Sequence, residues 1–457
     1  MATADVLGLS ISELGALYRS RAVSPVEVTR AVLRKAEKER RRLNAFITLL
    51  PDEALRAAAE AEKAFRAGSP ASPLTGVPVS LKDLFCTRGI RTTCGSRILK
   101  DFIPDHSATA VERLEAAGAV IFAKANLLEF AYGTVHPDYG QCNNPHDPRR
   151  TAGGSSGGSA ASVAAGIGYA SLGTDTGGSI RIPAAYCGVA GLKPTYGLVS
   201  TFGVFPLSWS LDHVGPIART AADLAVVLDA IAGFDPRDRY SDPRAGEKWS
   251  ELKSGSAALK LGLFPAADLA GLDPDVKACF DRALRTLKQL GYRFVEADLP
   301  RAREVEAALM RVLLPEAAHI HRRWLDRGDD YAPQTYQQIM EGTKMKAADY
   351  LKGVEERGQV KRGVSLALER LEAIVSPTVS FPAPAQDPVI GDEGKDEMVF
   401  TGIFNVSGHP AVTVPCGFTS DGLPVGIQFA GASFSDRRLL ALAQRFQEAR
   451  KPAGGVT

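Results

Sequence analysis

The sequence predicts an α/β fold in one large domain with a helical insertion, and three observations lead to this prediction. Between residues 76 and 235, short apolar runs typical of strands alternate with small-residue or amphipathic stretches typical of helices, which is the pattern of a layered α/β protein. A later region repeats the order strand, helix, strand. Residues 301–373 then have an almost wholly helical pattern, and the chain returns to strand-like runs from residue 374.

The first clear element is a helix that begins after Ser24. Ser24 can cap the helix, Pro25 suits its first position, and Glu27 can reach back to complete a capping box. The helix should run to about Arg41. Its basic end (KAEKERRR) is typical of a solvated helix face near a negative helix terminus, so we assign it no function.

The next elements follow from apolar periodicity and helix stop signals. The strand-like runs are VPVSL, AVIFA, IGYASL, LKLGLF, YRFVEA, AIVSP, AVTVPCGF and VGIQFAG. Helices are expected at 108–117, at 159–165, before Gly291, and at 436–449. No long Pro/Gly/Ser linker interrupts them, so we expect a single domain over residues 1–457. Its parts are N-terminal helices (1–70), a core with the polar motifs described below (71–235), a helical subregion (301–373) and a C-terminal part of the core (374–457).

Composition gives no sign of a nucleic-acid or membrane partner. The formal net charge is +2, and no run of about 18 apolar residues and no secretory or twin-arginine signal is present. The six cysteines lack regular spacing or a CxxC pair, which favours a reducing compartment over a disulfide scaffold or thiolate metal site. We expect a cytoplasmic monomer or homodimer that acts on a small molecule and needs no metal or cofactor.

The most unusual stretch is TAGGSSGGSAASVAAGIGYASLGTDTGGS, residues 151–179, where two Gly/Ser clusters flank apolar, structured sequence. Glycines let backbone N–H groups approach an anion closely, as in an oxyanion hole or a phosphate nest. A phosphate-binding P-loop would need Lys-Ser/Thr after the last glycine, and neither cluster has it. The apolar sequence between the clusters argues against a flexible linker.

An alternative interpretation is a Ser-His-Asp esterase of the α/β-hydrolase type. Residues 153–157 match G-x-S-x-G, which would make Ser155 the nucleophile of an elbow, with His319, His321 or His409 as later partners. The segment before the glycines, CNNPHDPRRTA, is polar and broken by proline, whereas a nucleophile elbow must follow a strand. This interpretation is therefore disfavoured.

Three motifs together resemble the amidase signature family: LKD at residues 81–83, GGSSGGSA at 153–160, and GTDTGGSIRIPAAYCGVAGLKPTYG at 173–197. The resemblance continues to the C-terminal runs PAVTVPCGF and GLPVGIQFAG, so it covers nearly the whole chain. It implies a mixed central β-sheet flanked by helices on both faces. It also implies a Ser-Ser-Lys triad of Ser179 as nucleophile, Ser155 in a cis peptide as proton carrier, and Lys82 as base.

The residue types suit this chemistry. A serine hydroxyl needs an adjacent base, and a lysine can serve if burial disfavours its charged form. In the predicted strand GVPVSLK, Lys82 stands at the strand end, where its tip could enter a site. Ser156 adjoins Ser155, and only the family's register prefers Ser155 as the proton carrier.

Neighbouring residues have supporting roles by the same resemblance. The backbone N–H groups of Thr176, Gly177, Gly178 and Ser179 stand where an oxyanion hole is needed. Asp175 and Arg181 are expected to pair and hold this loop, with Ser156 as a further structural support. The glycines of the first cluster, Gly153 and Gly154, are expected to contact substrate.

Other chemical patterns carry less weight. His319 and His321 resemble an HxH metal motif, but residues two apart on a helix point to different faces, so we predict no metal site. The SxxK match at 250–253 lacks its partner motifs. His213 is expected in packing or beside the site, and Cys187 in the core.

The substrate is expected to be an amide or a related C–N compound. The family's glutamine-hydrolysing subunit of tRNA-dependent amidotransferases carries an aspartate near an FN-x-x-G segment, and we place Met398 at that position, with Asp396 and Glu397 close by. A pocket edged by Met398, Phe400, Tyr132 and Phe130 would favour an apolar or aromatic group over a zwitterionic amino acid. Carbamates (urethanes) and aryl acylamides are further candidates, and the glutamine-hydrolysing subunit is the alternative function.

Overall fold

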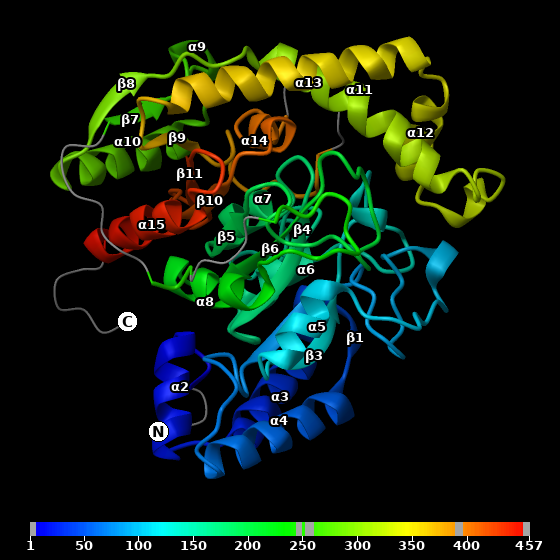
Figure 1. Ribbon diagram of the computed structural model, residues 1–457, viewed down its shortest axis with the longest axis vertical. Helices are drawn as coiled ribbons and strands as arrows, with labels where there is room; N and C mark the ends of the chain where they lie inside the picture. Colours follow the sequence, from blue (N-terminus) through cyan, green and yellow to red (C-terminus); the bar gives the residue numbers. More distant parts are fainter. Residues whose placement is uncertain (1–5, 244–248, 252–259, 389–395, 451–457) are drawn as a thin grey trace.

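One mixed β-sheet organises the protein (Figure 1). The computed structural model describes residues 6–243, 249–251, 260–388 and 396–450. In these residues eleven strands form the sheet. In spatial order they are β1 (Phe46–Leu49), β3 (Val120–Ala125), β2 (Pro78–Lys82), β4 (Ala170–Asp175), β6 (His213–Ala218), β5 (Ala190–Lys193), β10 (Ala411–Phe418), β11 (Pro424–Ala430), β9 (Ala373–Pro377), β7 (Lys260–Leu263) and β8 (Arg293–Glu296).

The sheet contains two parallel groups, which are joined by antiparallel strands. Strands β3, β2 and β4 run parallel, as do β9, β7 and β8. The pairs β1/β3, β4/β6, β5/β6, β5/β10, β10/β11 and β11/β9 are antiparallel. The predicted mixed α/β architecture is confirmed.

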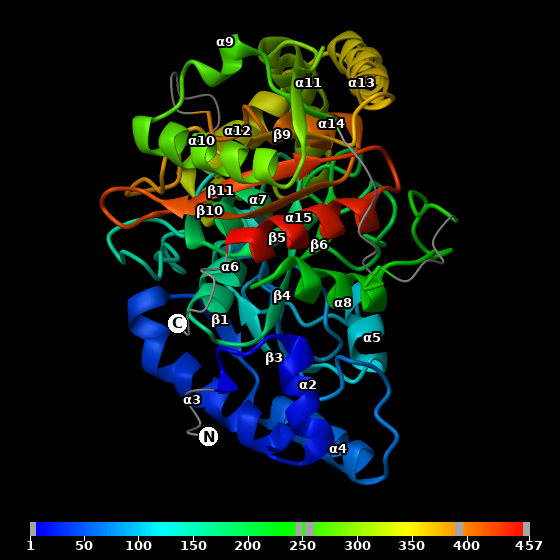
Figure 2. The same cartoon turned by 90° about the vertical axis from the view of Figure 1, so that its left-hand side faces the viewer.

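Helices cover both faces of the sheet. Helices α6 and α7 pack on one face, while α8, α10 and α15 cover the other (Figure 2). The N-terminal helices and the helical subregion lie at opposite ends of the molecule (Figure 1). The helices are α2 (Ile11–Ser20), α3 (Pro25–Leu43), α4 (Pro51–Arg66), α5 (Thr109–Ala116), α6 (Gly157–Ala164), α7 (Arg181–Cys187), α8 (Ala221–Ile231), α9 (Ala266–Leu269), α10 (Pro274–Gln289), α11 (Ala302–His321), α12 (Pro333–Thr343), α13 (Ala347–Leu368), α14 (Gly402–Ser407) and α15 (Asp436–Arg450), with 3-10 turns η1 (Arg97–Leu99), η2 (Glu129–Ala131) and η3 (Gly328–Asp330).

Local sequence signals account for many of these elements. Helix α3 has the predicted capping box, in which Ser24 and Glu27 each accept a backbone N–H, and it ends at Leu43 with Asn44 in the left-handed conformation. Strands β9 and β10 coincide with the predicted runs AIVSP and AVTVPCGF, and α15 begins at the predicted Asp436.

Strand β6 is absent from the predicted runs, because its sequence HVGPIA contains Gly215 and Pro216. The glycine is required by close packing of the neighbouring backbone, since a Cβ at Gly215 would lie 2.1 Å from the carbonyl oxygen of Leu192. Strand β6 nevertheless lies in the middle of the sheet and pairs with β4 over its whole length.

The parallel strands β2, β3 and β4 are buried along their whole length. Most of their side chains are apolar, but Lys82, Lys124 and Thr174 are buried there as well. Buried polar groups of this kind need partners, so the carboxyl ends of these strands are the place to look for chemistry. No helix among the described ranges is long and apolar enough to cross a membrane.

Candidate active site

Lys82 is the last residue of β2 and is fully buried. Its Nζ lies 2.7 Å from the Oγ of Ser155 and 2.9 Å from the Oγ1 of Thr174, to which it can donate hydrogen bonds. Burial lowers the pKa of Lys82 to about 7, although the nearby carboxylates Asp175 and Asp212 act in the opposite direction. A substantial fraction of Lys82 is therefore uncharged near neutral pH, as a general base requires.

The first Gly/Ser cluster brings Ser155, rather than Ser156, to this lysine. The peptide bond between Gly154 and Ser155 is cis. The Ser156 hydroxyl points elsewhere and donates to the carbonyl oxygen of Thr174 at 3.2 Å, while its N–H donates to the carbonyl oxygen of Ser179. The cluster is tightly packed, because a Cβ on Gly154 would lie 2.4 Å from a methyl carbon of Leu128.

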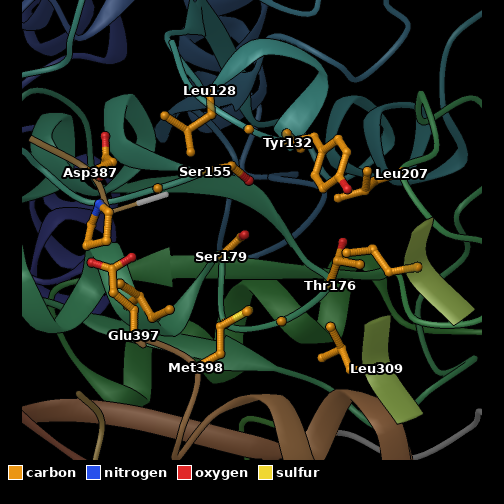
Figure 3. A pocket seen from close by; sticks show the side chains of 18 of the residues that line it. Leu128, Tyr132, Ser155, Thr176, Ser179, Leu207, Leu309, Asp387, Glu397 and Met398 are labelled. Carbon is orange, nitrogen blue, oxygen red and sulfur yellow. The ribbon is translucent and has the colours of Figure 1, made fainter. Parts of the chain in front are cut away.

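The second cluster follows β4 and places Ser179 beside Ser155. Figure 3 shows both serine side chains in the same pocket. Gly178 has a φ of +147°, and a Cβ there would lie 2.5 Å from the Oγ1 of Thr401. A Cβ on Gly177 would lie 2.5 Å from the sulfur of Met398. Gly178 admits only glycine, and a side chain at Gly177 would have to displace Met398, so the N–H groups of this loop can approach a substrate oxygen closely.

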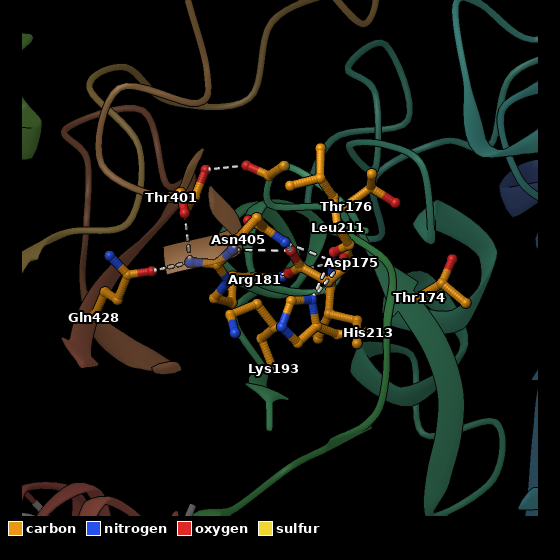
Figure 4. Close-up of polar contacts among 12 residues, drawn as sticks. Thr174, Asp175, Thr176, Arg181, Lys193, Leu211, His213, Thr401, Asn405 and Gln428 are labelled. Carbon is orange, nitrogen blue, oxygen red and sulfur yellow. Dashed lines mark hydrogen bonds and ion pairs between the residues drawn. The ribbon is translucent and has the colours of Figure 1, made fainter. Parts of the chain in front are cut away.

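A buried ion pair holds the second cluster (Figure 4). Asp175 and Arg181 are both fully buried, and Arg181 donates two hydrogen bonds to the carboxylate, at 3.0 and 2.8 Å. Burial alone would raise the pKa of Asp175, but Arg181 and Asn405 outweigh it and hold this pKa well below its usual range. Asn405 accepts from Arg181 at 2.6 Å and donates to Asp175 at 2.8 Å. The hydrogen bonds from Arg181 and Asn405 thus compensate the buried carboxylate.

Sequence reasoning missed several partners of this loop. Arg181 also donates to Gln428 at 2.7 Å, and Thr401 donates to the carbonyl oxygen of Gly177 at 2.6 Å. Thr176 donates to Asp212 at 2.7 Å. Asn405 belongs to the FN-x-x-G segment, and Asp212 directly precedes His213. Both segments stand out in the sequence, but for Met398 and His213, and this closeness is the signal that could have identified Asn405 and Asp212.

The pocket around Ser155 and Ser179 has two chemically different ends. One end is apolar, and its walls include Tyr132, Leu207 and Leu309 (Figure 3). The opposite end carries the carboxyl groups of Asp387 and Glu397, and Met398 lies between the two ends. Asp396 also lines the pocket and is close enough to Glu397 to raise the pKa of that carboxyl. The two serines stand between these ends, where a scissile bond would have one substituent on each side.

The carboxyl end is desolvated. Burial and the neighbouring Asp387 raise the pKa of Glu397 to about 8, and Glu397 accepts a hydrogen bond from the Tyr186 hydroxyl at 2.7 Å. Burial likewise raises the pKa of Asp387 to about 6, and it raises that of Asp396. Among the residues that the structure describes, none of these three carboxyls forms an ion pair. A positive charge on a bound molecule would favour the ionised forms of these carboxyls, whose oxygens also accept hydrogen bonds.

Two aromatic side chains predicted at the pocket edge lie elsewhere. Phe130 lies in η2 with a φ of 53° and packs against Phe205, His321 and Trp324. Phe400 is fully buried and packs edge-on against Phe264. The structure thus turns both rings into the core and leaves Tyr132 and Met398 in the pocket wall.

The first-cluster glycines also divide between two places. Gly154 lines the pocket beside Ser155. Gly153 has a φ of +84° and packs against Pro183 and Tyr186, where a Cβ would lie 2.7 Å from the tyrosine ring. Gly153 therefore allows the loop to pack closely and does not line the pocket.

The histidines lie apart from the serine-lysine group. The Nδ1 of His213 lies 2.7 Å from the carbonyl oxygen of Leu211, and burial keeps the pKa of this imidazole well below its usual value. His319 packs on Trp209, while His321 lies 2.9 Å from the hydroxyl of Tyr331. In the described part of the chain, no group of three potential ligands could hold a metal ion.

The esterase interpretation does not fit this arrangement. Ser155 contacts Lys82, and His409 lies 3.2 Å from Ser365 instead.

The remaining two sequence predictions concern Cys187 and the SxxK match. Cys187 is buried, with its thiol donating to the carbonyl oxygen of Ala152 at 3.3 Å. Lys253, the lysine of the SxxK match, lies outside the described residues.

Comparisons with known proteins show the family of this chain. The family model described as Amidase matches residues 27–440. A glutamyl-tRNA(Gln) amidotransferase subunit from Geobacter sp. (strain M21) is 38% identical over 480 residues, covering 97% of each chain. A solved structure described as a crystal structure of amidase has 34% identity and a TM-score of 0.85, covering 97% of this chain and 100% of that one.

Another solved structure comes from a vestigial protein complex that reveals the evolutionary origins of an s-triazine catabolic enzyme. It has 31% identity and a TM-score of 0.90, and covers 97% of this chain and 99% of that one. Fold and pocket together define the class, which is an α/β enzyme that hydrolyses amides. This chain belongs to the amidase signature family.

Proposed function

We propose that this protein hydrolyses C–N bonds of small amides with Ser179 as nucleophile, Ser155 as proton carrier and Lys82 as base. The observation that carries the proposal is the contact between Lys82 and Ser155 at 2.7 Å. The lysine is fully buried and, among the described residues, its hydrogen-bond partners are the hydroxyls of Ser155 and Thr174, so its neutral form is accessible. Its nitrogen faces the serine that shares the pocket with Ser179.

The chemical steps follow from these positions. The Ser179 hydroxyl oxygen attacks the amide carbonyl, its proton passes to Ser155, and the Ser155 proton passes to neutral Lys82. Backbone N–H groups of residues 176–179 stabilise the negative charge on the former carbonyl oxygen. The C–N bond then breaks as the proton returns through Ser155 to the leaving nitrogen. Water attacks the acyl-enzyme with the same base, which releases the acid and restores Ser179.

A fluorophosphonate probe tests the nucleophile directly. Peptide mapping after labelling should place the probe on Ser179, and Ser179→Ala should remain unlabelled. Ser155→Ala should label slowly, because the nucleophile keeps its place but loses its proton carrier. Labelling on Ser155, or an active amidase without labelling, would overturn the assignment.

The apolar end supports carbamates and aryl acylamides as further substrates. Tyr132, Leu207 and Leu309 are all nearly fully buried and offer an aromatic or alkyl group an apolar surface. Carbamates present the same carbonyl and nitrogen leaving group, so the same steps apply. Initial rates on benzamide, a p-nitroanilide and an aryl carbamate, measured with one enzyme preparation, would rank these classes.

Glutamine hydrolysis for a tRNA-dependent amidotransferase is a second candidate. The carboxyl end of the pocket supports it, since Asp396 and Glu397 directly precede Met398, line the pocket with it and could meet an ammonium group. The relative from Geobacter is also named as part of a glutamyl-tRNA(Gln) amidotransferase. The test is glutaminase activity of the isolated chain, with Glu397→Gln as the matched variant. Rapid release of ammonia from glutamine, lost in the variant, would favour this candidate over the apolar amides.

The expected setting of the reaction is also part of the proposal. We propose a cytoplasmic monomer or homodimer that acts on a small-molecule substrate. The six cysteines are free in the structure, which is compatible with a reducing compartment. Size-exclusion chromatography with light scattering would determine the oligomeric state.

A further inference from the structure

Asp212 lies directly beside the proposed oxyanion loop because of the pairing between β4 and β6. The antiparallel register places Asp175 opposite His213. One step further along both chains, Thr176 and Asp212 meet, and the Thr176 hydroxyl donates to the Asp212 carboxylate at 2.7 Å. Thr176 is nearly fully buried and is the first residue of the loop that ends at Ser179.

The same carboxylate also organises one wall of the pocket. Asp212 accepts the backbone N–H of Leu207 at 2.9 Å and that of Ser208 at 3.1 Å. Leu207 lines the apolar end of the pocket, and Thr176 also lines the pocket. A single side chain therefore connects the loop that carries Ser179 with the wall that faces it.

A second carboxylate extends this connection to the helical subregion. Glu316 on α11 is buried and accepts from the hydroxyls of Ser208 and Ser210, each at 2.6 Å. Leu309 and Leu313 precede Glu316 on the same helix and line the pocket. The segment 207–212 is thus fixed at two places. Asp212 at its end binds Thr176 of the core and the N–H groups of Leu207 and Ser208, and Glu316 of the helical subregion binds Ser208 and Ser210.

Asp212 is also connected to the base through one short segment. Lys82 donates to Thr174, and Thr176, two residues further along, donates to Asp212. Asp175 and Asp212 are the two carboxylates that favour the protonated form of Lys82, with a smaller contribution from Cys94. Asp175 is paired with Arg181, whereas Asp212 forms no ion pair in the described part of the chain. Burial raises the pKa of Asp212 to about 6, the hydrogen bonds from Thr176, Leu207 and Ser208 oppose this, and Glu316 adds to it. The three hydrogen bonds favour the ionised form of this carboxyl.

We propose that Asp212 is a positioning residue for this reaction: it holds Thr176, and with it the oxyanion loop, and its charge stabilises Lys82 when the lysine takes up the Ser179 proton. This inference rests on the proposed Ser-Ser-Lys mechanism. It gives Asp212 two separable roles. The hydrogen bond to Thr176 sets the geometry of the loop, and the negative charge sets the proton affinity of the base.

Two variants separate the roles. Thr176→Val removes the hydroxyl but keeps the carboxylate, so kcat should fall about 10- to 100-fold as the oxyanion donors lose their alignment, with little change in the pH profile. Thr176→Ser should restore most of the loss. Asp212→Asn should lower kcat as well. It should also lower the pKa of Lys82, because a negative charge near the lysine is gone. The acid limb of the kcat/KM profile, where activity falls as Lys82 gains its proton, should therefore move to lower pH.

Asp238 supplies a matched control. It is a buried carboxylate that caps a turn by accepting the N–H and hydroxyl of Thr201 and the N–H of Tyr240, and it does not line the pocket. Asp238→Asn should lower the melting temperature to an extent similar to Asp212→Asn while leaving kcat and the pH profile unchanged. Thermal unfolding of all variants shows how much of each effect is structural.

The outcomes distinguish the two levels of the proposal. If Thr176→Val keeps wild-type kcat and Asp212→Asn leaves the acid limb in place, Asp212 only caps its own segment, and this inference is wrong. That result would leave the mechanism intact as long as Ser179→Ala is inactive. If Ser179→Ala retains activity, the mechanism itself fails, whatever the Asp212 variants do.

Discussion

Two buried lysines on adjacent parallel strands have opposite surroundings. Lys82 on β2 and Lys124 on β3 are both fully buried, and the strands pair in a register that puts Leu81 beside Lys124. Lys124 lies 3.3 Å from the carboxylate of Asp83 and donates to the carbonyl oxygen of Phe85 and the hydroxyl of Thr92, both at 2.7 Å. Lys82 instead donates to the hydroxyls of Ser155 and Thr174.

The difference shows that burial alone does not make a lysine a base. A buried ammonium next to a carboxylate is compensated, because each charge is the other's partner. A buried ammonium whose direct contacts are hydroxyls is compensated less, because its nearest carboxylates lie further away, so its neutral form becomes accessible near pH 7. The hydrogen-bonding partner therefore distinguishes the two lysines. Lys124 beside Asp83 is a structural cation, and Lys82 beside the Ser155 hydroxyl is the proposed base.

The largest expected effect is the loss of the base. Lys82→Ala should lower kcat by roughly 10²- to 10⁴-fold, the range that a positioned general base contributes. Alkaline pH should not restore the rate, since no other neutral amine replaces Lys82 at Ser155. Steady-state kinetics from about pH 6 to 10, with a melting curve to show that the variant is folded, provides the check. Recovery of the rate at high pH would mean that another group is the base.

The corresponding change at the other lysine should act on stability. Lys124→Met leaves Asp83 as an uncompensated buried charge and should lower the free energy of unfolding by about 3–5 kcal/mol. Chemical denaturation measures this loss. Asp83→Asn combined with Lys124→Met should recover part of it, because neither charge is then left alone. A single variant as stable as the wild type would contradict the assignment of a structural ion pair.

The contrast can be sharpened by giving Lys82 a charged neighbour. Because neutral Lys82 is the active form, kcat/KM should fall as pH decreases through about 7, where the lysine gains its proton. Thr174→Asp should raise the pKa of Lys82 by about 1–3 units and shift this acid limb to higher pH. Thr174→Asn is the control, similar in size but uncharged. An acid limb that does not move would show that the lysine does not govern it.

The smallest effect is expected at Ser156. Ser156→Ala removes one hydrogen bond to the carbonyl oxygen of Thr174 and should cost about 1 kcal/mol of stability. The rate should change by no more than a few-fold, because this hydroxyl does not contact Lys82. A loss as large as that of Ser155→Ala would reverse the roles of the two serines.

The elements that could be predicted from the sequence are those that obey local rules. Ser24 and Glu27 specify the start of α3 through a capping box that spans four neighbouring residues. Strands β9 and β10 follow from short apolar runs, and the position of Lys82 at a strand end follows from the same pattern. Such signals depend on residues close in the chain, so they can be read without knowing what lies across the sheet.

Features that depend on distant partners arise only in the folded chain. Arg181 meets Asn405 and Gln428 more than 200 residues further along the chain, and β6 is held in the sheet by β4 and β5 despite Pro216. Contacts with distant residues also turn the rings of Phe130 and Phe400 into the core. Such contacts likewise bring Asp387, Asp396 and Glu397 together in the pocket. A side chain's direction is set by the space and charge around it, and these exist only once the chain has folded.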